Sequence, residues 1–128
     1  MAMLAVGVDP DNLREISMDP SVMDWGLQDI SASDAGRVHD AGNSMYKMRT
    51  SQKRKLNLTW AEPTAAQTAE ILQAFNPEYI WVRYPDAMSG ALETREFYVG
   101  DRSAPVRWYQ LPGRENRYKT LSFNIIER

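Results

Sequence analysis

The stretch Lys53-Arg-Lys-Leu-Asn-Leu-Thr-Trp60 decides the fold class, because its apolar and polar residues alternate. Every second residue from Leu56 to Trp60 is apolar, and the residues between them are polar. Successive side chains of a strand point to opposite faces of the sheet, so this period of two predicts a half-buried β-strand.

Further strands are predicted where aromatic and β-branched residues gather between turn residues. Turns at Gly100-Asp101 and Pro112–Asn116 are short, which indicates antiparallel links. Pro85-Asp86 is expected to end the strand that starts at Tyr79. The predicted strands are Tyr79–Tyr84, Arg95–Val99, Val106–Tyr109 and Tyr118–Ile126, with weaker patterns at Met1–Val8, Leu13–Ile16 and Val22–Ile30.

One helix is predicted between the strands. Thr64 and Gln67 have the spacing of a capping box, in which each side chain satisfies the other residue's backbone N–H. Asn76-Pro77 is expected to stop the helix. The apolar positions at helical spacing are Ala65, Ala69, Leu72 and Phe75, with Ile71 beside them, and Leu72 is expected to be buried.

These elements predict a mainly β fold with one α-helix (α+β), as an antiparallel β-sandwich or a partly closed barrel covered by the helix. The 128 residues have the size of one domain, residues 1–128. Ser, Ala, Asp, Gly and Asn dominate Ser31–Ser44, which predicts a long loop that becomes ordered against a neighbouring molecule. No long hairpin arm is evident in the pattern.

Composition excludes several classes of function. Fifteen Lys and Arg against seventeen Asp and Glu give a net charge of -2, so no general field attracts nucleic acid or an anionic membrane. The absence of cysteine excludes disulfides and thiolate metal sites. The apolar start, Met1–Val8, is too short for a signal sequence or a membrane span, so a protein outside the membrane is expected.

No catalytic or cofactor chemistry is predicted. His39 is the single histidine, and no Gly-x-Ser-x-Gly motif accompanies Asp40 and Ser44 beside it. Asp9-x-Asp11 lacks the oxygen ligands and glycine that a calcium loop needs, and no glycine-rich phosphate loop precedes a helix. We therefore expect no enzyme, cofactor, metal or small-molecule substrate, and a small enzyme that uses His39 remains the third alternative.

A basic cluster supports the second alternative, a nucleic-acid-binding accessory protein. The cluster runs from Arg49 to Lys55, and nearby Tyr46 could stack on bases. Strand alternation places Lys53 and Lys55 on one face and Arg54 on the other, which breaks up a continuous basic groove. The same charges could instead protect an edge strand or pair with a neighbouring subunit.

Aromatic residues favour an interface between subunits. Tyr79–Tyr84 places large apolar side chains on both of its faces, so one face is expected to meet the helix and the other to meet either a second sheet of the same molecule or another chain. Trp, Tyr and Arg dominate the binding energy of protein interfaces. The candidate subunit-interface residues are Lys53, Lys55, Trp81, Arg83, Tyr98, Arg102 and Trp108.

Several blocks carry a family resemblance. Phe97-Tyr-Val-Gly-Asp-Arg-Ser103 is the most specific of them. Together the blocks resemble an uncharacterised family of small proteins from phages and prophages of Gram-positive bacteria, encoded among tail genes. The other blocks are Leu27-Gln-Asp-Ile-Ser31, Lys53-Arg-Lys-Leu56, Trp60, Tyr84-Pro-Asp86 and Ser122-Phe-Asn-Ile-Ile-Glu127.

The resemblance implies a virion structural protein that contacts itself or other tail proteins. Such a protein would lie in the bacterial host cytoplasm during assembly and afterwards in the virion tail. The order strand, helix, strand, strand also resembles the sandwich-plus-helix of phage tail-tube and distal-tail proteins. Because the chain is short for a tube protein and shows no clear arm, a minor tail component is favoured.

Overall fold

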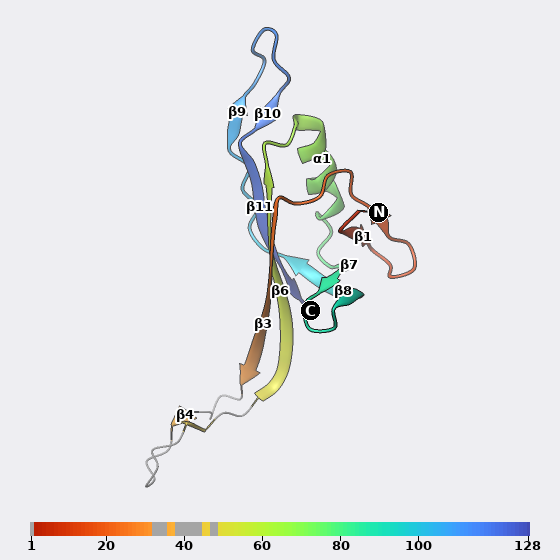
Figure 1. Ribbon diagram of the computed structural model, residues 1–128, viewed down its shortest axis with the longest axis vertical. Helices are drawn as coiled ribbons and strands as arrows, with labels where there is room; N and C mark the ends of the chain where they lie inside the picture. Colours follow the sequence, from red (N-terminus) through yellow and green to blue (C-terminus); the bar gives the residue numbers. More distant parts are fainter. Residues whose placement is uncertain (1, 32–35, 38–44, 47–48) are drawn as a thin grey trace.

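The computed structural model describes residues 2–31, 36–37, 45–46 and 49–128 (Figure 1). One helix and eleven strands are present in this part of the chain. Their bounds are β1 (Ala5–Gly7), β2 (Arg14–Glu15), β3 (Val22–Ser31), β4 (Gly36–Arg37), β5 (Met45–Tyr46), β6 (Arg49–Ala61), α1 (Ala65–Ala74), β7 (Ile80–Asp86), β8 (Ala91–Val99), β9 (Val106–Trp108), β10 (Arg117–Tyr118) and β11 (Thr120–Glu127).

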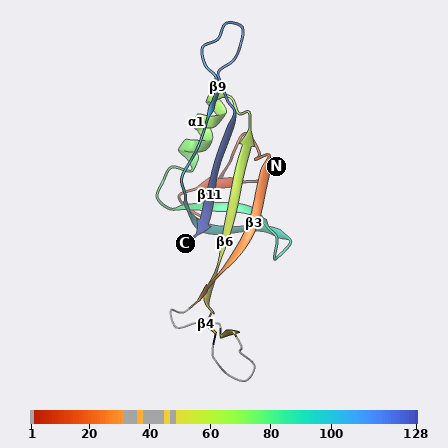
Figure 2. The same ribbon diagram turned by 90° about the vertical axis from the view of Figure 1, so that its left-hand side faces the viewer.

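Seven strands form one antiparallel sheet in the order β2-β1-β7-β8-β11-β6-β3. β3, β6 and β11 run along the long axis of the molecule, whereas β1, β7 and β8 cross them (Figures 1 and 2). The β9–β10 and β4–β5 pairs are separate two-stranded ladders. The prediction of a mainly β fold with one helix is confirmed, and the sheet is folded over without closing.

The sheet bends over on itself between β8 and β11. These strands pair only from Phe97, opposite Glu127, to Val99, opposite Ile125. The chain then turns at Gly100, whose N–H donates to the Asn124 carbonyl at 2.9 Å, and continues beside β11. A Cβ on residue 100 would lie 2.1 Å from Asn124 Oδ1, so glycine permits this close approach.

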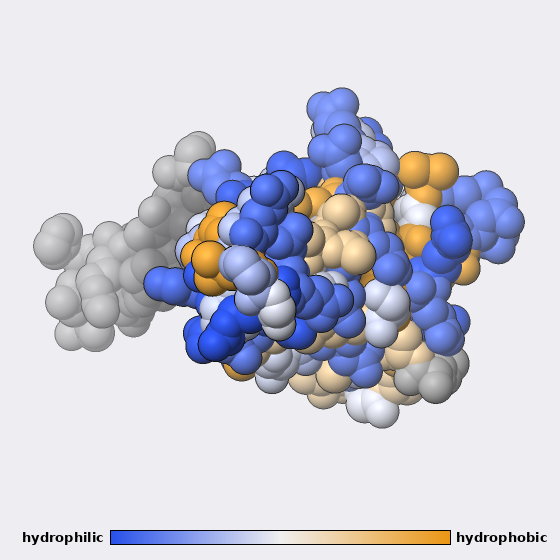
Figure 3. All heavy atoms as spheres, turned by 90° about the horizontal axis from the view of Figure 1, so that it is seen from above, coloured by the Kyte–Doolittle hydropathy of each residue, from blue (hydrophilic) through white to orange (hydrophobic). Residues whose placement is uncertain are grey.

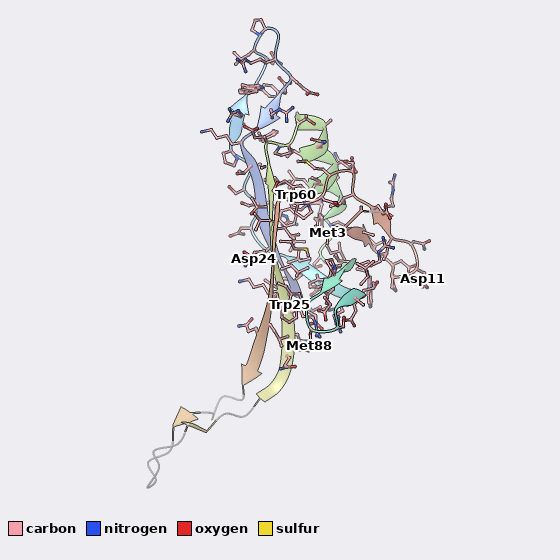
Figure 4. All side chains as sticks on the ribbon, viewed as in Figure 1. Met3, Asp11, Asp24, Trp25, Trp60 and Met88 are labelled. Atoms are coloured by element: carbon pink, nitrogen blue, oxygen red, sulfur yellow. The ribbon has the colours of Figure 1, made fainter. Side chains whose placement is uncertain are left out.

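The core lies between the β3–β6–β11 layer and the elements that cover its inner face, α1 and the crossing strands (Figure 4). Three aromatic rings join β6, α1 and β11. Phe75 has its ring centroid 6.4 Å from Trp60 and 4.9 Å from Phe123. Trp60 is fully buried, and its Nε1–H donates to the Met18 carbonyl at 2.8 Å. A large aromatic residue is therefore buried with its polar group satisfied.

The predicted capping box of α1 is present. Thr64 Oγ1 accepts from the Gln67 backbone N–H at 3.2 Å, and Gln67 Oε1 accepts from the Thr64 N–H at 3.0 Å. The helix ends at Ala74, before Asn76-Pro77, as the sequence predicts. Local hydrogen bonding therefore sets both ends of the helix.

The buried face of α1 differs from the prediction. Thr68, Ile71 and Phe75 are buried, whereas Leu72 is only partly buried and Ala69 is exposed. Thr68 can be buried because its hydroxyl donates to the Thr64 carbonyl at 2.9 Å. Ile71 and Phe75 of the predicted stripe are buried and Leu72 packs against the core, so the helix anchors the core as predicted, but the full burial of Leu72 is not observed.

We expect Thr64→Ala to lower the free energy of unfolding by about 1 kcal/mol, because the Gln67 N–H loses its acceptor. Thr64→Ser keeps an oxygen at this position and is the matched control, with an expected loss of a few tenths of a kcal/mol. Urea unfolding of both variants measures the difference. Equal losses would show that the hydroxyl oxygen does not cap the helix.

A long hairpin arm, formed by β3 and β6, projects beyond the body of the molecule (Figure 1). The pairing runs from Val22, opposite Thr59, to Ser31, opposite Arg49. The sequence did not predict this arm, because its strands are polar towards the tip and a long segment separates them. Of the predicted loop 31–44, residues 32–35 and 38–44 lie outside the described residues, and Gly36–Arg37 forms β4.

Candidate subunit interface

The outer face of the β3–β6–β11 layer is turned away from α1, and no described element covers it (Figure 2). This outer face is the one opposite to buried Leu56, Leu58 and Trp60. Figure 4 shows the alternation on β3, where Asp24 and Trp25 lie on opposite sides of the strand. The sheet therefore presents a large surface of side chains that the core does not use.

Cross-strand pairing arranges the outer face in rows. Lys55 lies between Gly26 and Ile126, and Ile126 is opposite Tyr98. This row combines a cation, an apolar side chain and a tyrosine that is 41% exposed. The two following rows are small and mostly polar, Asp24–Asn57–Asn124 and Val22–Thr59–Ser122.

Three of the predicted interface residues come together on this outer face. Lys55 and Tyr98 belong to the same row, and Lys53 lies two residues from Lys55 on the same side of β6. Lys53 Nζ donates to the carbonyl of Arg128 at 2.9 Å. These three residues are thus placed as an interface requires, and their role stays a prediction.

Two further predicted residues lie on the same side of the sheet but on the other side of the bend between β8 and β11. Trp81 and Arg83 alternate on β7 with buried Val82 and Tyr84, so they point away from the core. Arg83 Nη2 forms an ion pair with Glu15 at 3.3 Å, while its Nε is buried without a hydrogen-bond acceptor. The bend of the sheet separates Trp81 and Arg83 from the row that contains Lys55.

Arg102 and Trp108 lie elsewhere. Arg102 Nη2 donates to the Phe75 carbonyl at 3.1 Å, so it caps the C-terminal end of α1. Trp108 belongs to β9, in the hairpin at the opposite end from the arm (Figure 1). The seven predicted residues therefore do not form one continuous patch.

The basic cluster does not form a continuous groove in the described chain. Arg54 points to the inner side of β6, where its Nε lies 2.9 Å from Asp86 and its Nη1 lies 3.8 Å from Glu127. Lys53 and Lys55 point to the outer face. The side chain of Arg49 lies outside the described part. The Arg54 guanidinium is already paired with two carboxylates and is therefore less available to bind a phosphate.

A buried carboxylate fixes the base of the arm to the body. Asp86 Oδ1 accepts from Trp25 Nε1 at 2.8 Å and from Arg54 Nε at 2.9 Å, which come from the two strands of the arm. The hydroxyl of Tyr84 donates to the same oxygen at 3.2 Å, and the Ser89 N–H donates to Oδ2 at 3.1 Å. Asp86 thus connects β3, β6, β7 and the β7–β8 turn.

The environment sets the ionisation of this cluster. Burial alone would raise the pKa of the Asp86 carboxyl, but the donors around it outweigh burial and hold the pKa well below its usual range. Burial raises the pKa of Tyr84 to about 12, even though Arg95 donates to its hydroxyl oxygen at 2.8 Å. At neutral pH the cluster therefore holds an ionised carboxylate and a neutral phenol.

The depressed pKa of Asp86 predicts acid sensitivity. In the unfolded chain this carboxyl titrates near pH 4, so its stabilising effect is complete above about pH 4 and is lost as pH falls towards the lower folded pKa. Urea unfolding between about pH 2 and 6 should show this loss. Asp86→Asn should remove that part of the slope, whereas the exposed control Asp101→Asn should keep it. Equal slopes in wild type and Asp86→Asn would contradict the assignment.

Catalytic and metal sites find no support in the described part of the chain. His39 lies outside the described residues. No group of three or more His, Cys, Asp or Glu there could hold a metal ion. In the same ranges, no helix has the length and apolar character to cross a membrane.

Solved structures share this architecture. One is a chain of the tail of an empty gene transfer agent (GTA) particle, obtained with helical refinement and C6 symmetry. It superposes with a TM-score of 0.58 at 8% identity, over 99% of this chain and 90% of that chain. A chain from the virion of a native GTA particle gives 0.53 at 10% identity, over 98% and 91%. The likeness establishes a shared fold.

Sequence comparison adds no closer relative. No protein-family model matches the chain, and no curated protein matches it. The family resemblance to phages and prophages of Gram-positive bacteria thus stays a prediction, while the expected tail-protein fold is confirmed by structure.

Sequence reasoning missed two features of this surface. The sequence pattern places Asp86 at the end of a strand, as observed, but does not indicate that its carboxylate is buried and joined to both strands of the arm. The free edge of β3 was also missed: along its ten residues, β3 pairs only with β6 in the described sheet. An unpaired strand edge can pair with another chain, so the free edge adds a second possible contact to the outer face.

Proposed function

We propose that this protein is a structural subunit of a phage-like virion tail and works by contacts with copies of itself or with other tail proteins. The observation that carries the proposal is the shared fold, over nearly the whole chain, with a chain of an assembled GTA tail. A fold alone does not fix a function, so the local surfaces supply the second part of the argument.

Three surfaces of the molecule suit assembly. The outer face carries exposed polar and apolar side chains, the edge of β3 is free in the described sheet, and the β3–β6 arm projects from the body. Each of them leaves backbone or side-chain groups available to a neighbour. The short chain and the lack of a clear arm are the two reasons to favour a minor component, and the second of them does not hold. Since an arm is present, the proposal includes a subunit that repeats along the tail.

Charge reversal at Lys53 and Lys55 tests whether the outer face is part of the interface. We expect Lys53→Glu/Lys55→Glu to weaken association at least tenfold, about 1.4 kcal/mol, because reversed charges at a contact repel. Stability should change by about 1 kcal/mol or less, since both side chains point away from the core and are only partly buried, and Lys53 loses one exposed hydrogen bond. Sedimentation velocity measures the association, and urea unfolding measures the stability.

The double variant Lys53→Gln/Lys55→Gln separates charge from shape. It should weaken association less than the glutamate variant, because it removes the charges without reversing them. Wild-type association in both variants would remove the outer face from the interface. Nucleic-acid binding is the competing function, and a salt-dependent gel shift lost in both variants would favour it.

A further inference from the structure

The β9–β10 hairpin forms an exposed apolar knob at the end of the molecule opposite the arm (Figure 1). Val106, Tyr109 and Leu111 are 51%, 56% and 48% exposed, respectively. Seen from above, the hydrophobic atoms form separate patches among hydrophilic ones (Figure 3). We call residues 106–118 the knob. Its large apolar side chains contribute little to the core of this molecule.

The knob is nevertheless held in one shape. Two guanidinium groups contact the Trp108 ring, with Arg107 at 4.6 Å and Arg114 at 4.7 Å from the ring centroid. Trp108 Nε1 donates to the Glu115 carbonyl at 2.6 Å. At the tip, the backbone N–H of Arg114 donates to the Leu111 carbonyl at 3.1 Å and closes the turn. Such preorganisation lowers the entropy that a docking element loses on binding.

Backbone strain is concentrated in the same element. The non-glycine residues with positive φ in the described chain are Gln110 (57°) within the knob and Glu62 (51°) at its base. Asn116 Oδ1 accepts from the Gln110 N–H at 2.7 Å, and Glu62 forms an ion pair with Arg107 at 3.0 Å. Strained backbone that is held in this way often marks a functional element.

An apolar groove lies elsewhere on the molecule, between α1 and the β1–β2 hairpin. It has a volume of about 560 Å³, which is within the size range of ligand pockets, roughly 300–1,000 Å³. Ala66 and Ala69 form one wall, and their small side chains leave the space open. Val6 and Ile16 belong to the other wall. The groove has room for the apolar tip of a hairpin.

The knob and the groove carry opposite charge. Arg107, Arg114, Arg117 and Lys119 against Glu115 and Glu62 give the hairpin and its base four positive charges and two negative charges, net +2. The charged residues that line the groove are Glu15 and Glu70 against Arg14, net -1, and Asp9 and Asp11 in the neighbouring β1–β2 turn add two further carboxylates beside it. Charge complementarity of this kind steers association and fixes its orientation.

We propose that the β9–β10 knob of one molecule docks into the groove between α1 and the β1–β2 hairpin of a second copy. Tyr109 and Leu111 enter the groove, and the arginines of the knob face its acidic rim. This inference deepens the proposed function, on which it rests, by assigning one of the contacts.

The contact is heterologous, because the knob and the groove are different surfaces of one chain. An open chain of such contacts leaves a free knob at one end and a free groove at the other, so the contact propagates until a ring closes or continues as a helical array. A particle tail with helical and C6 order contains assemblies of this type. An isologous dimer, by contrast, would stop at two copies.

Two single variants of the full chain test the contact. Leu111→Asp places a charge on the knob, and Ala69→Trp fills the groove from an exposed position of α1. Leu92→Asp is the matched control, since Leu92 is 43% exposed and lies on β8, outside both surfaces. Sedimentation velocity should show association weakened at least tenfold by each of the first two and unchanged by the control.

Mixing the two variants gives the decisive result. The Leu111→Asp chain keeps an intact groove and the Ala69→Trp chain keeps an intact knob, so an equimolar mixture should form a 1:1 complex of the two chains that neither variant forms with itself. Absence of that complex overturns the proposal, as does a loss from Leu92→Asp equal to that from Leu111→Asp.

Other outcomes separate this inference from the proposed function. If wild type self-associates and neither variant affects it, the knob-and-groove contact is wrong while the proposed function stands. If Leu111→Asp abolishes binding to another tail protein but not self-association, the occupant of the groove is not a second copy. Wild type that stays monomeric to about 1 mM also overturns the inference, and the proposed function falls only if tail particles do not bind it either.

Discussion

Replacing Asp86 with alanine is expected to lower the free energy of unfolding by about 3–5 kcal/mol. The carboxylate is almost fully buried and accepts from Trp25, Arg54, Tyr84 and Ser89. Its removal leaves a guanidinium and an indole N–H without their acceptor in a partly buried site, which costs more than the loss of one hydrogen bond. A domain of this size is stable by only about 5–15 kcal/mol, so the loss is large.

Trp25→Phe is the graded control for this prediction. It removes one of the donors but keeps an aromatic ring at the base of the arm, so we expect a smaller loss of about 1–2 kcal/mol. Amide exchange adds a local test, because β3 and β6 should exchange faster around Trp25 and Arg54 in the Asp86→Ala variant. A loss below about 1 kcal/mol in Asp86→Ala would show that the cluster does not hold the arm.

Removing the arm is expected to abolish association without unfolding the molecule. Gln28 lies opposite Lys53, so the two can be joined by Asn-Gly, which forms the turn that suits a two-residue hairpin. The change deletes residues 29–52 and leaves Leu56, Leu58 and Trp60 in the core. We expect stability within about 1 kcal/mol of wild type and association weakened more than a hundredfold, about 2.8 kcal/mol.

The control for the deletion is a chain that keeps the arm at its full length. A single substitution on the outer side of the base of the arm, Gln28→Ser, leaves the hairpin intact and should affect association far less than the deletion. Sedimentation velocity and urea unfolding report on all three chains. If the shortened chain assembles as wild type does, the arm is not part of the interface.

Local signals explain what the sequence could predict. The alternation from Lys53 to Trp60 is a property of consecutive residues, and β6 is observed there. The capping box needs only Thr64 and Gln67, which are three residues apart and form both hydrogen bonds. Propensity and spacing act over such short distances, so strands and helix ends are predictable from a single sequence.

The arm could not be predicted because its pairing is non-local. Val22 and Thr59 are opposite each other across a separation of 37 positions in the chain. The strand near Val22 has a weak pattern, since its outer face carries Asp24, Gly26 and Gln28, which are unfavourable or neutral in strands. Only the partner strand shows that these residues continue a ladder.

Asp86 and Arg102 show the same limit for single side chains. Pro85-Asp86 has the composition of a turn, yet both residues belong to β7, and the carboxylate turns inward to meet Arg54. Arg102 is of a residue type common at interfaces, yet its guanidinium donates to the carbonyl of Phe75, the C-cap of α1. Residue type predicts what a side chain can do, whereas its partners depend on tertiary contacts.

The presence of this chain in virion tails tests the central claim most directly. Particles purified from a host that carries the gene can be separated into heads and tails, and quantitative mass spectrometry gives the copies of the chain per particle. A tail subunit must be found in the tail fraction in multiple copies per particle. A chain that is expressed in the host but absent from purified particles would contradict the account.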